Sequence, residues 1–166
     1  MKIFRRVIGA LLAAGVLWLA YTHFFPNDEK LIRRTLARLA TTASVPANPT
    51  PLGNLRAANA LQDFFTPEVE VEVDVPIEGR HTFTGREELI QAAVAARNNY
   101  RGLTVEFLDV NVAVAAGHQE ATAELTAKAT QPGDAEIHVQ EMKLQLRKKD
   151  DAWRIWRAES VRTLKL

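Results

Sequence analysis

The sequence predicts an α+β protein in which a curved antiparallel sheet is covered by three helices. The sheet is predicted by four long segments between residues 103 and 160 that alternate apolar and polar side chains, which is the period of a half-buried strand. The helices are predicted by three segments between residues 27 and 99 whose apolar residues recur three and four positions apart. Curvature is predicted because the apolar phase slips by one residue inside the strands, and such slips indicate β-bulges.

The phase slips fall in three of the four C-terminal strands. The first lies near Phe107 and Leu108, the second just past Gln140, and the third between Ile155 and Trp156. A sheet bent in this way, with small residues on its inner face, leaves room on its concave side. Helices or a ligand must fill that room, because voids are costly. The small residues of the second strand that create this room are Ala121, Ala123, Ala127 and Ala129.

The first two helices are expected on either side of a loop at residues 41–50. Asn27 can cap the first helix, whose first turn is acidic. The second helix opens at Pro51, a residue suited to the first helical position, and ends at Thr66. The apolar stripe of the first helix is Ile32, Leu36 and Leu39, and the inner face of the second is Ala57, Ala58, Leu61, Phe64 and Phe65.

A short hairpin and the third helix follow. Residues 68–75 alternate valine with glutamate or aspartate, which predicts a strand with one wet, acidic face, and residues 80–83 predict its return strand. Thr84 and Glu87 have the spacing of a capping box, so the third helix should begin here and run to about Asn99.

The N-terminal segment predicts a membrane anchor. Residues 1–6 form a short basic lead, and residues 7–25 carry no formal charge, apart from a titratable His23. A helix of this length spans roughly 28 Å, which is close to the thickness of a hydrocarbon core. Because the basic residues precede the apolar segment, the N-terminus should be cytoplasmic and the domain at residues 27–166 extracytoplasmic, in a single-pass protein of the inner or plasma membrane.

Two other interpretations of residues 7–25 remain open. One is a signal peptide cleaved near residues 21–24, although the residues there are bulky where a cleavage site needs small ones. The other is a buried core helix, against which the basic lead argues. Arg33, Arg34 and Arg38 fall just after this segment, and they either contact lipid phosphates or form a solvated face.

Composition excludes several classes of function. Apolar residues make up 47% of the chain, charged residues 25%, and the net charge is +1, so no strong field attracts nucleic acid. The absence of cysteine excludes disulfides, thiolate metal sites and cysteine nucleophiles. The histidines are isolated in the sequence, and no phosphate-binding glycine loop or nucleophile elbow is present. We therefore expect no metal and no cofactor.

Two stretches resemble a known family. Residues 84–89, after a short strand, and residues 150–155, at the entry to the last strand, resemble the SnoaL-like branch of the nuclear transport factor 2-like superfamily. The resemblance covers about residues 27–164 and implies a cone: a highly curved sheet wrapped on three helices, with a pocket at the open end. The pocket is expected to be lined by Leu61, Phe64, Phe65, Phe83, Phe107, Ala123, Leu125, Met142 and Trp156.

Catalysis of the kind found in this superfamily would need a base facing an oxyanion donor inside the cone. Weak candidates are Asp74 and His81 as bases and Arg97 as an anion-binding group, and each has a competing surface or structural role. The two tyrosines, Tyr21 and Tyr100, both fall outside the predicted sheet, so neither is placed as an oxyanion donor.

The leading hypothesis is therefore a membrane-anchored module that binds a small apolar ligand or a protein partner and is not an enzyme. The alternative is a small-molecule isomerase, cyclase or lyase that acts in the cone pocket. A homodimer formed through the outer face of the sheet is a further hypothesis, although that face is predicted to be polar. Its residues are Thr122, Thr126, Lys128, Lys143 and Gln145.

Overall fold

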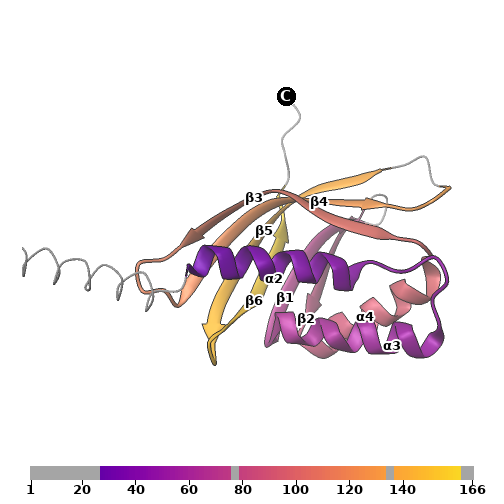
Figure 1. Cartoon of the computed structure of the whole chain (residues 1–166), viewed down its shortest axis with the longest axis horizontal. Helices are drawn as coiled ribbons and strands as arrows, with labels where there is room; N and C mark the ends of the chain where they lie inside the picture. The colour runs from indigo at the N-terminus through magenta and orange to yellow at the C-terminus, as the bar shows by residue number, and fades with distance from the viewer. Residues whose placement is uncertain (1–26, 76–78, 134–136, 162–166) are drawn as a thin grey trace, which may run out of the picture.

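A computed structural model describes residues 27–75, 79–133 and 137–161, and it shows three helices packed on one face of a curved six-stranded sheet (Figure 1). The predicted anchor at residues 7–25 lies outside these residues, and none of the helices within them is long and apolar enough to cross a membrane. The helices are α2 (Asp28–Ala43), α3 (Pro51–Ala60) and α4 (Arg86–Asn99), with a 3-10 helix η1 (Leu61–Phe64). The strands are β1 (Phe65–Val75), β2 (Gly79–Thr84), β3 (Thr104–Val114), β4 (Glu120–Thr130), β5 (His138–Lys149) and β6 (Ala152–Ser160).

The sheet has the order β2-β1-β6-β5-β4-β3. All neighbours are antiparallel except β1 and β6, which run parallel, so the expectation of a wholly antiparallel sheet is wrong at this pair. The reason lies in the path of the chain. After the β1–β2 hairpin, α4 carries the chain to the far edge of the sheet, where β3 starts, and the three following strands return step by step until β6 lies beside β1 (Figure 1).

Two of the three predicted phase slips are present. The pairing of β3 with β4 shifts between Leu108 and Asn111, where Asp109 adopts a left-handed backbone with φ of 51°. Leu108 therefore stays on the outer face, 41% exposed, and does not begin the inner apolar set as expected. The register between β5 and β6 also shifts by one residue, because Trp156 is an extra residue in β6. Each bulge bends its strand and adds to the curvature of the sheet.

The slip predicted in β5 is absent. The pairing of β5 with β4 keeps one register from Arg147 to His138, so Gln140 shares the concave face with Met142 and Leu144. Val139 then falls on the outer face and is 60% exposed. A slip just past Gln140 would place this residue on the solvent side, whereas its amide has hydrogen-bond partners at the rim of the concave face.

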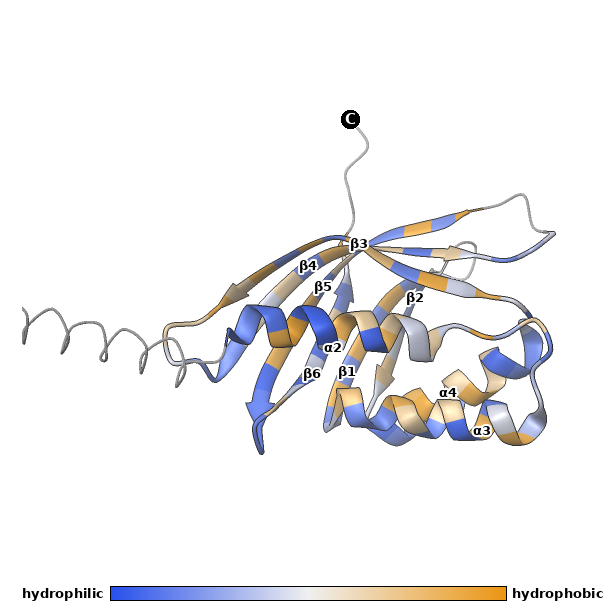
Figure 2. Ribbon diagram, viewed as in Figure 1, coloured by the Kyte–Doolittle hydropathy of each residue, from blue (hydrophilic) through white to orange (hydrophobic). Residues whose placement is uncertain are grey.

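The core lies between this concave face and the helices. One row of side chains crosses all six strands in register, and Ile32 and Leu36 of α2 are buried against the same cluster. Figure 2 shows the hydrophobic residues alternating with hydrophilic ones along the strands, as a sheet with one buried face requires. The residues of the row are Phe83, Val71, Ala158, Leu144, Ala123 and Val112.

The helix termini follow the predictions only in part. Asn27 caps α2 by accepting a hydrogen bond from the backbone N–H of Lys30, as expected. α3 ends at Ala60, earlier than predicted, because the chain tightens into η1 before β1 begins. The capping box at α4 is also shifted: Gly85, with φ of 86°, is the cap, and Glu88 accepts the backbone N–H of Thr84.

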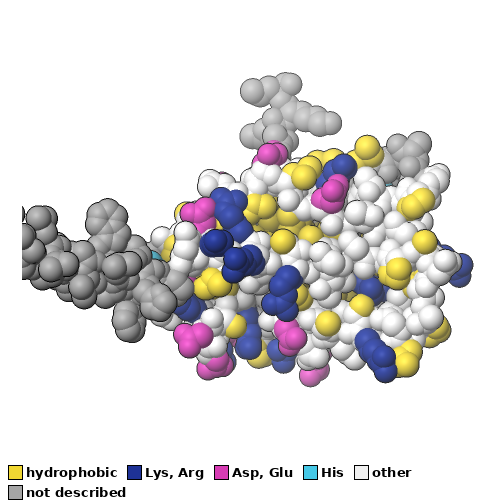
Figure 3. All heavy atoms as spheres, in the orientation of Figure 1, with side chains coloured by type: hydrophobic (Ala, Val, Ile, Leu, Met, Phe, Trp, Pro, Cys, Tyr) yellow, Lys and Arg dark blue, Asp and Glu magenta, His cyan; other side chains and the backbone are white. Residues whose placement is uncertain are grey.

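The outward side of α2 is basic. Lys and Arg side chains gather over this helix in Figure 3, and Lys30, Arg34 and Arg38 are exposed. Arg33 pairs with Glu29 at 2.9 Å and also donates to the backbone oxygen of Val110 on β3. These contacts give one arginine a role inside the domain, and contact of the others with lipid phosphates stays a prediction.

Candidate functional site

An apolar cavity of about 300 Å³ lies between α2, α4 and the concave face of the sheet. It exists because the inner face of β4 carries the small residue Ala127 where the curved sheet moves away from the helices. Among the residues that the structure describes, its wall contains thirteen apolar side chains and a single polar one, Gln140 of β5. The apolar residues are Leu39, Ala43, Phe65, Val71, Val73, Leu89, Phe107, Leu125, Ala127, Met142, Leu144, Ile155 and Ala158.

A small polar network borders this cavity. Gln140 donates from Nε2 to Ser160 Oγ at 2.7 Å and to the backbone oxygen of Asp74 at 3.2 Å. Ser160 Oγ in turn accepts the backbone N–H of Asp74 at 3.1 Å and lies 3.7 Å from Met142 Sδ. The network ties β5, β6 and the end of β1 together, so the orientation of the Gln140 amide is fixed by neighbouring strands.

The structure places the three candidate catalytic residues in three different environments. The side chain of Asp74 is on the outer face of the sheet, half-buried, where Arg80 lies 3.5 Å away. His81 pairs with Val73 and so shares the concave register, but it is exposed and does not line the cavity. Asp74 therefore has the wrong orientation for a base inside the cone, because successive side chains of β1 point to opposite faces.

Arg97 is buried at the end of α4 and has a structural contact. Its Nη1 donates to the backbone oxygens of Thr42 at 2.8 Å and Ala43 at 3.3 Å, which are carbonyls of the last turn of α2. Burial lowers the pKa of the guanidinium below its ordinary value. The side chain thus stabilises the negative end of a helix, and it does not line the cavity.

The expected pocket-lining residues divide into three groups. Phe65, Phe107, Leu125 and Met142 line the cavity. Leu61, Phe64 and Ala123 are buried in the core, and Phe83 packs against that core. Trp156 is misplaced in the prediction, because the β6 bulge takes it out of the inward alternation of Ile155 and Ala158.

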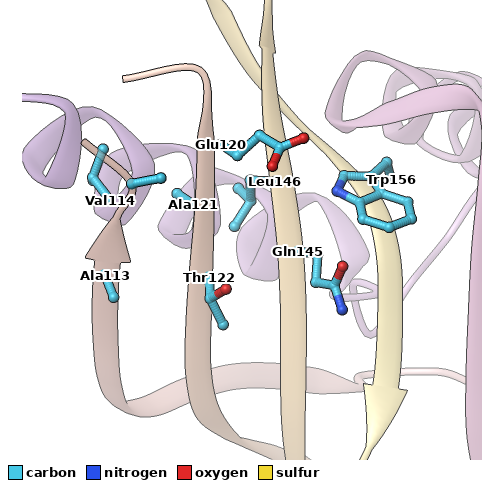
Figure 4. A pocket seen from close by; sticks show the side chains of 9 residues that line it. Ala113, Val114, Glu120, Ala121, Thr122, Gln145, Leu146 and Trp156 are labelled. Carbon is cyan, nitrogen blue, oxygen red and sulfur yellow. The ribbon is translucent and has the colours of Figure 1, made fainter. Parts of the chain in front are cut away.

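Trp156 instead lines a second hollow, of about 320 Å³, together with Gln145 and Thr122 (Figure 4). Thr122 and Gln145 pair with each other and alternate with the inner residues of β4 and β5, so this hollow opens on the outer sheet face. The guanidinium of Arg147 lies 4.9 Å from the centre of one Trp156 ring. Exposed Leu108, Ile137 and Val139 make the outer face more apolar than predicted, and a homodimer through this face stays a hypothesis.

Sequence reasoning missed a buried polar cluster at the N-terminus of α2. The carboxylate of Asp28 is 5% exposed, and three groups surround it: His118 Nδ1 at 2.9 Å, Lys148 Nζ at 3.1 Å and Trp153 Nε1 at 3.1 Å. Burial alone would raise the pKa of Asp28, but the hydrogen bonds from these three residues and the charge of Lys148 lower it below its ordinary value. The only signal in the sequence was an acid in a first helical turn, because the three partners are 90 to 125 residues away.

The described part of the chain contains no group of three or more His, Asp or Glu side chains that could hold a metal ion. His118 contacts the carboxylate of Asp28 and so forms part of the cluster described above.

Solved structures with the same fold come from several bacteria. A protein of unknown function with a cystatin-like fold from Nostoc punctiforme is 17% identical, covers 86% of this chain and 96% of its own, and superposes with a TM-score of 0.62. A protein provisionally named a scytalone dehydratase, from Novosphingobium aromaticivorans, is 15% identical over 82% of this chain and 85% of its own, with a TM-score of 0.60. A protein provisionally named an aromatic ring hydroxylase, from the same organism, is 14% identical over 82% of this chain and 90% of its own, with a TM-score of 0.64.

At these identities the similarity establishes the fold alone, since one fold serves many functions. No curated protein sequence matches the chain. The family model of the SnoaL-like domain matches residues 53–159, which contain most of α3, all of α4 and the whole sheet except the last residue of β6. The chain therefore belongs to the SnoaL-like domain family, and its structure has the cystatin-like, nuclear transport factor 2-like arrangement of a curved sheet on three helices.

Proposed function

We propose that this protein is a membrane-anchored, extracytoplasmic module that binds a small apolar molecule in the cavity between its sheet and its helices. The observation that supports the proposal is the composition of the cavity wall: of its fourteen described side chains, thirteen are apolar and the remaining one, Gln140, is neutral. Water binds weakly in an apolar cavity of this size, because a bound water molecule needs several polar partners. The cavity can instead hold an apolar ligand.

The membrane part of the proposal depends on residues 1–25. Their basic lead and uncharged segment of nineteen residues match a signal anchor, and α2 begins three residues after that segment. We expect the full-length chain to remain in the membrane pellet after alkaline carbonate extraction, and the domain to be digested by protease added to the extracytoplasmic side. Release of the chain by carbonate, or protection of the domain from that protease, would contradict this part of the proposal.

Ligand binding can be measured at the cavity wall itself. The chain has two methionines, Met1 and Met142, and Met142 lines the cavity. In the full-length chain, labelled with ¹³C at the methionine methyl groups and reconstituted in lipid nanodiscs, we expect indane to shift the Met142 resonance saturably. For an apolar ligand of this size the dissociation constant should be on the order of 0.1–1 mM.

Filling the cavity should remove this binding. Ala127→Trp places an indole in the space that Ala127 leaves on the cavity wall, so we expect indane to bind at least tenfold more weakly. Thr126→Trp is the matched control, because Thr126 is the neighbouring residue on β4 and points to the opposite face, and it should leave the affinity unchanged. Equal dissociation constants of indane for the two variants, or no saturable shift of the Met142 resonance in the original chain, would disprove binding in the cavity.

The alternative is an enzyme that acts on a small molecule in the same cavity. The names of two structural relatives, a dehydratase and a ring hydroxylase, support it, and His81 is the candidate base on the concave register. The cavity wall itself presents only Gln140 as a group able to form hydrogen bonds. If new resonances of a reaction product appeared when the chain is titrated with a small molecule, they would favour this alternative over a binding module.

A further inference from the structure

We infer that Gln140 selects among apolar ligands, and that the preferred class is a neutral alcohol or phenol whose hydroxyl group donates to the amide oxygen of this residue. The inference depends on the proposed ligand-binding function and narrows the class of ligand. It comes from the one polar side chain in the cavity wall and from the way its own amide nitrogen is occupied.

The position of Gln140 requires an explanation because it interrupts an apolar face. On the concave side of β5 it stands in line with Met142, Leu144 and Leu146. A leucine or methionine here would extend the same apolar wall, whereas the half-buried amide of Gln140 loses part of its hydration, which costs free energy unless its polar atoms are paired. The nitrogen of the amide is paired within the domain, whereas no residue that the structure describes donates a hydrogen bond to its oxygen.

The orientation of the amide is set by its partners. The backbone oxygen of Asp74, 3.2 Å away, can only accept a hydrogen bond, so the nitrogen of Gln140 must face it. The second N–H points to Ser160 Oγ at 2.7 Å. Both hydrogens of Nε2 are therefore in use, and Oε1 is left as the hydrogen-bonding atom of Gln140 that no described residue contacts.

Ser160 cannot reverse this arrangement at low cost. Its hydroxyl oxygen already accepts from Gln140 and from the backbone N–H of Asp74, and its own hydrogen is near the backbone oxygen of Glu72 and Met142 Sδ. If the amide of Gln140 flipped, its oxygen would face the Asp74 carbonyl oxygen, and two acceptors would oppose each other. Gln140 thus offers the cavity an acceptor and no donor.

This asymmetry decides which ligands gain from Gln140. A ligand hydroxyl can donate to Oε1 and recover the hydrogen bond that it loses on leaving water. A ligand with only acceptor atoms finds no partner in the wall and loses affinity, because an unpaired polar group is buried. A carboxylate or phosphate is disfavoured more strongly, since none of the described residues that line the cavity is cationic.

The test compares 5-indanol with 5-fluoroindane, which has nearly the same shape but no donor, in the full-length chain in nanodiscs. The Met142 methyl shift gives both dissociation constants. We expect 5-indanol to bind about fivefold more tightly than 5-fluoroindane. In Gln140→Met the preference should be lost or reversed, while the affinity for 5-fluoroindane stays within about twofold, because methionine keeps the length of the side chain. Because Gln140→Met adds a third methionine methyl signal, the Met142 signal of that variant is assigned by comparison with the spectrum of the original chain.

Ser160→Ala is the control, because it removes one partner of Nε2 and leaves the Asp74 contact and Oε1 in place. The preference for 5-indanol should persist there. An equal affinity for both probes in the original chain would overturn the role of Gln140 and leave the apolar cavity itself intact, as long as indane still binds. A loss of preference in Ser160→Ala as large as in Gln140→Met would also overturn it, because the polar network as a whole would then set the preference.

Discussion

Replacing Asp28 with alanine is expected to lower the free energy of unfolding by about 3 kcal/mol. The substitution leaves Lys148 and Trp153 without the carboxylate that both contact at 3.1 Å, and removing one partner of a buried charged cluster typically costs about 3–5 kcal/mol. We take the lower end because the Lys148 side chain is 15% exposed and His118 is 53% exposed, so water can solvate both after the change. Pulse proteolysis of the full-length chain in detergent micelles, over a urea series, measures the difference.

Glu29→Ala is the matched control for this substitution. Glu29 is the next residue in the same helical turn, also acidic, but it is 49% exposed and pairs only with Arg33 one turn later. Such a surface pair contributes about 0–1 kcal/mol, so the control should lose no more than about 1 kcal/mol relative to the original chain. Equal losses for the two variants would mean that Asp28 acts only as an acid at a helix N-terminus.

The effect of Asp28 should also depend on pH in a defined direction. Because its pKa is lowered in the folded state, the carboxylate contributes stability that is fully present above its ordinary value of 3.8. That contribution is lost as the pH falls from about 4 toward the lower folded value. The difference in stability between the original chain and Asp28→Asn, which cannot ionise, should therefore be largest at neutral pH and shrink in acid. A difference that is constant from pH 7 to pH 3 would contradict the cluster's electrostatic role.

The fold could be predicted from the sequence where local patterns carry it. The alternation of β4 and the slips near Leu108 and Trp156 are periodicity signals, and they indicated long strands that curve. The parallel pairing of β1 with β6 has no such signal, since it follows from the route of the chain after α4. The predicted slip at Gln140 was wrong for a different reason. Hydrophobic pattern alone assigns a polar residue to the solvent side, and the hydrogen-bond partner that keeps Gln140 on the concave side, Ser160, is on another strand.

The candidate site shows the same division. Residues of the cavity such as Phe107 and Leu125 were predicted because their apolar character and their strand phase agree. Asp28 and Arg97 were not assigned their roles, because each depends on contacts between elements that are far apart in sequence. A helix-terminal acid and a helix-terminal arginine look like surface residues in any single sequence, and only their contacts with elements far away in the sequence bury them.

Arg97→Leu is expected to lower the free energy of unfolding by about 2 kcal/mol. Two opposing effects decide this value. Leucine is an apolar replacement that removes the cost of burying a charge, which acts in favour of the variant. Against it, the carbonyls of Thr42 and Ala43 lose a charged donor at 2.8 and 3.3 Å, and hydrogen bonds to charged groups contribute about 1.5–3 kcal/mol. The last turn of α2 contains no basic residue of its own, so nothing within the helix replaces that donor.

Arg101→Leu provides the comparison, because Arg101 follows α4 closely but is exposed, and its replacement should change stability by less than about 0.5 kcal/mol. The two arginine variants can be measured by the same pulse proteolysis and then titrated with indane. Ala43 belongs to both the carbonyl contact and the cavity wall, so loosening the end of α2 should weaken indane binding in Arg97→Leu and leave it unchanged in Arg101→Leu. If Arg97→Leu were as stable as the original chain, relief of the buried charge would fully offset the lost hydrogen bonds. Unchanged indane binding in Arg97→Leu would show that the contact of Arg97 with the end of α2 does not shape the cavity.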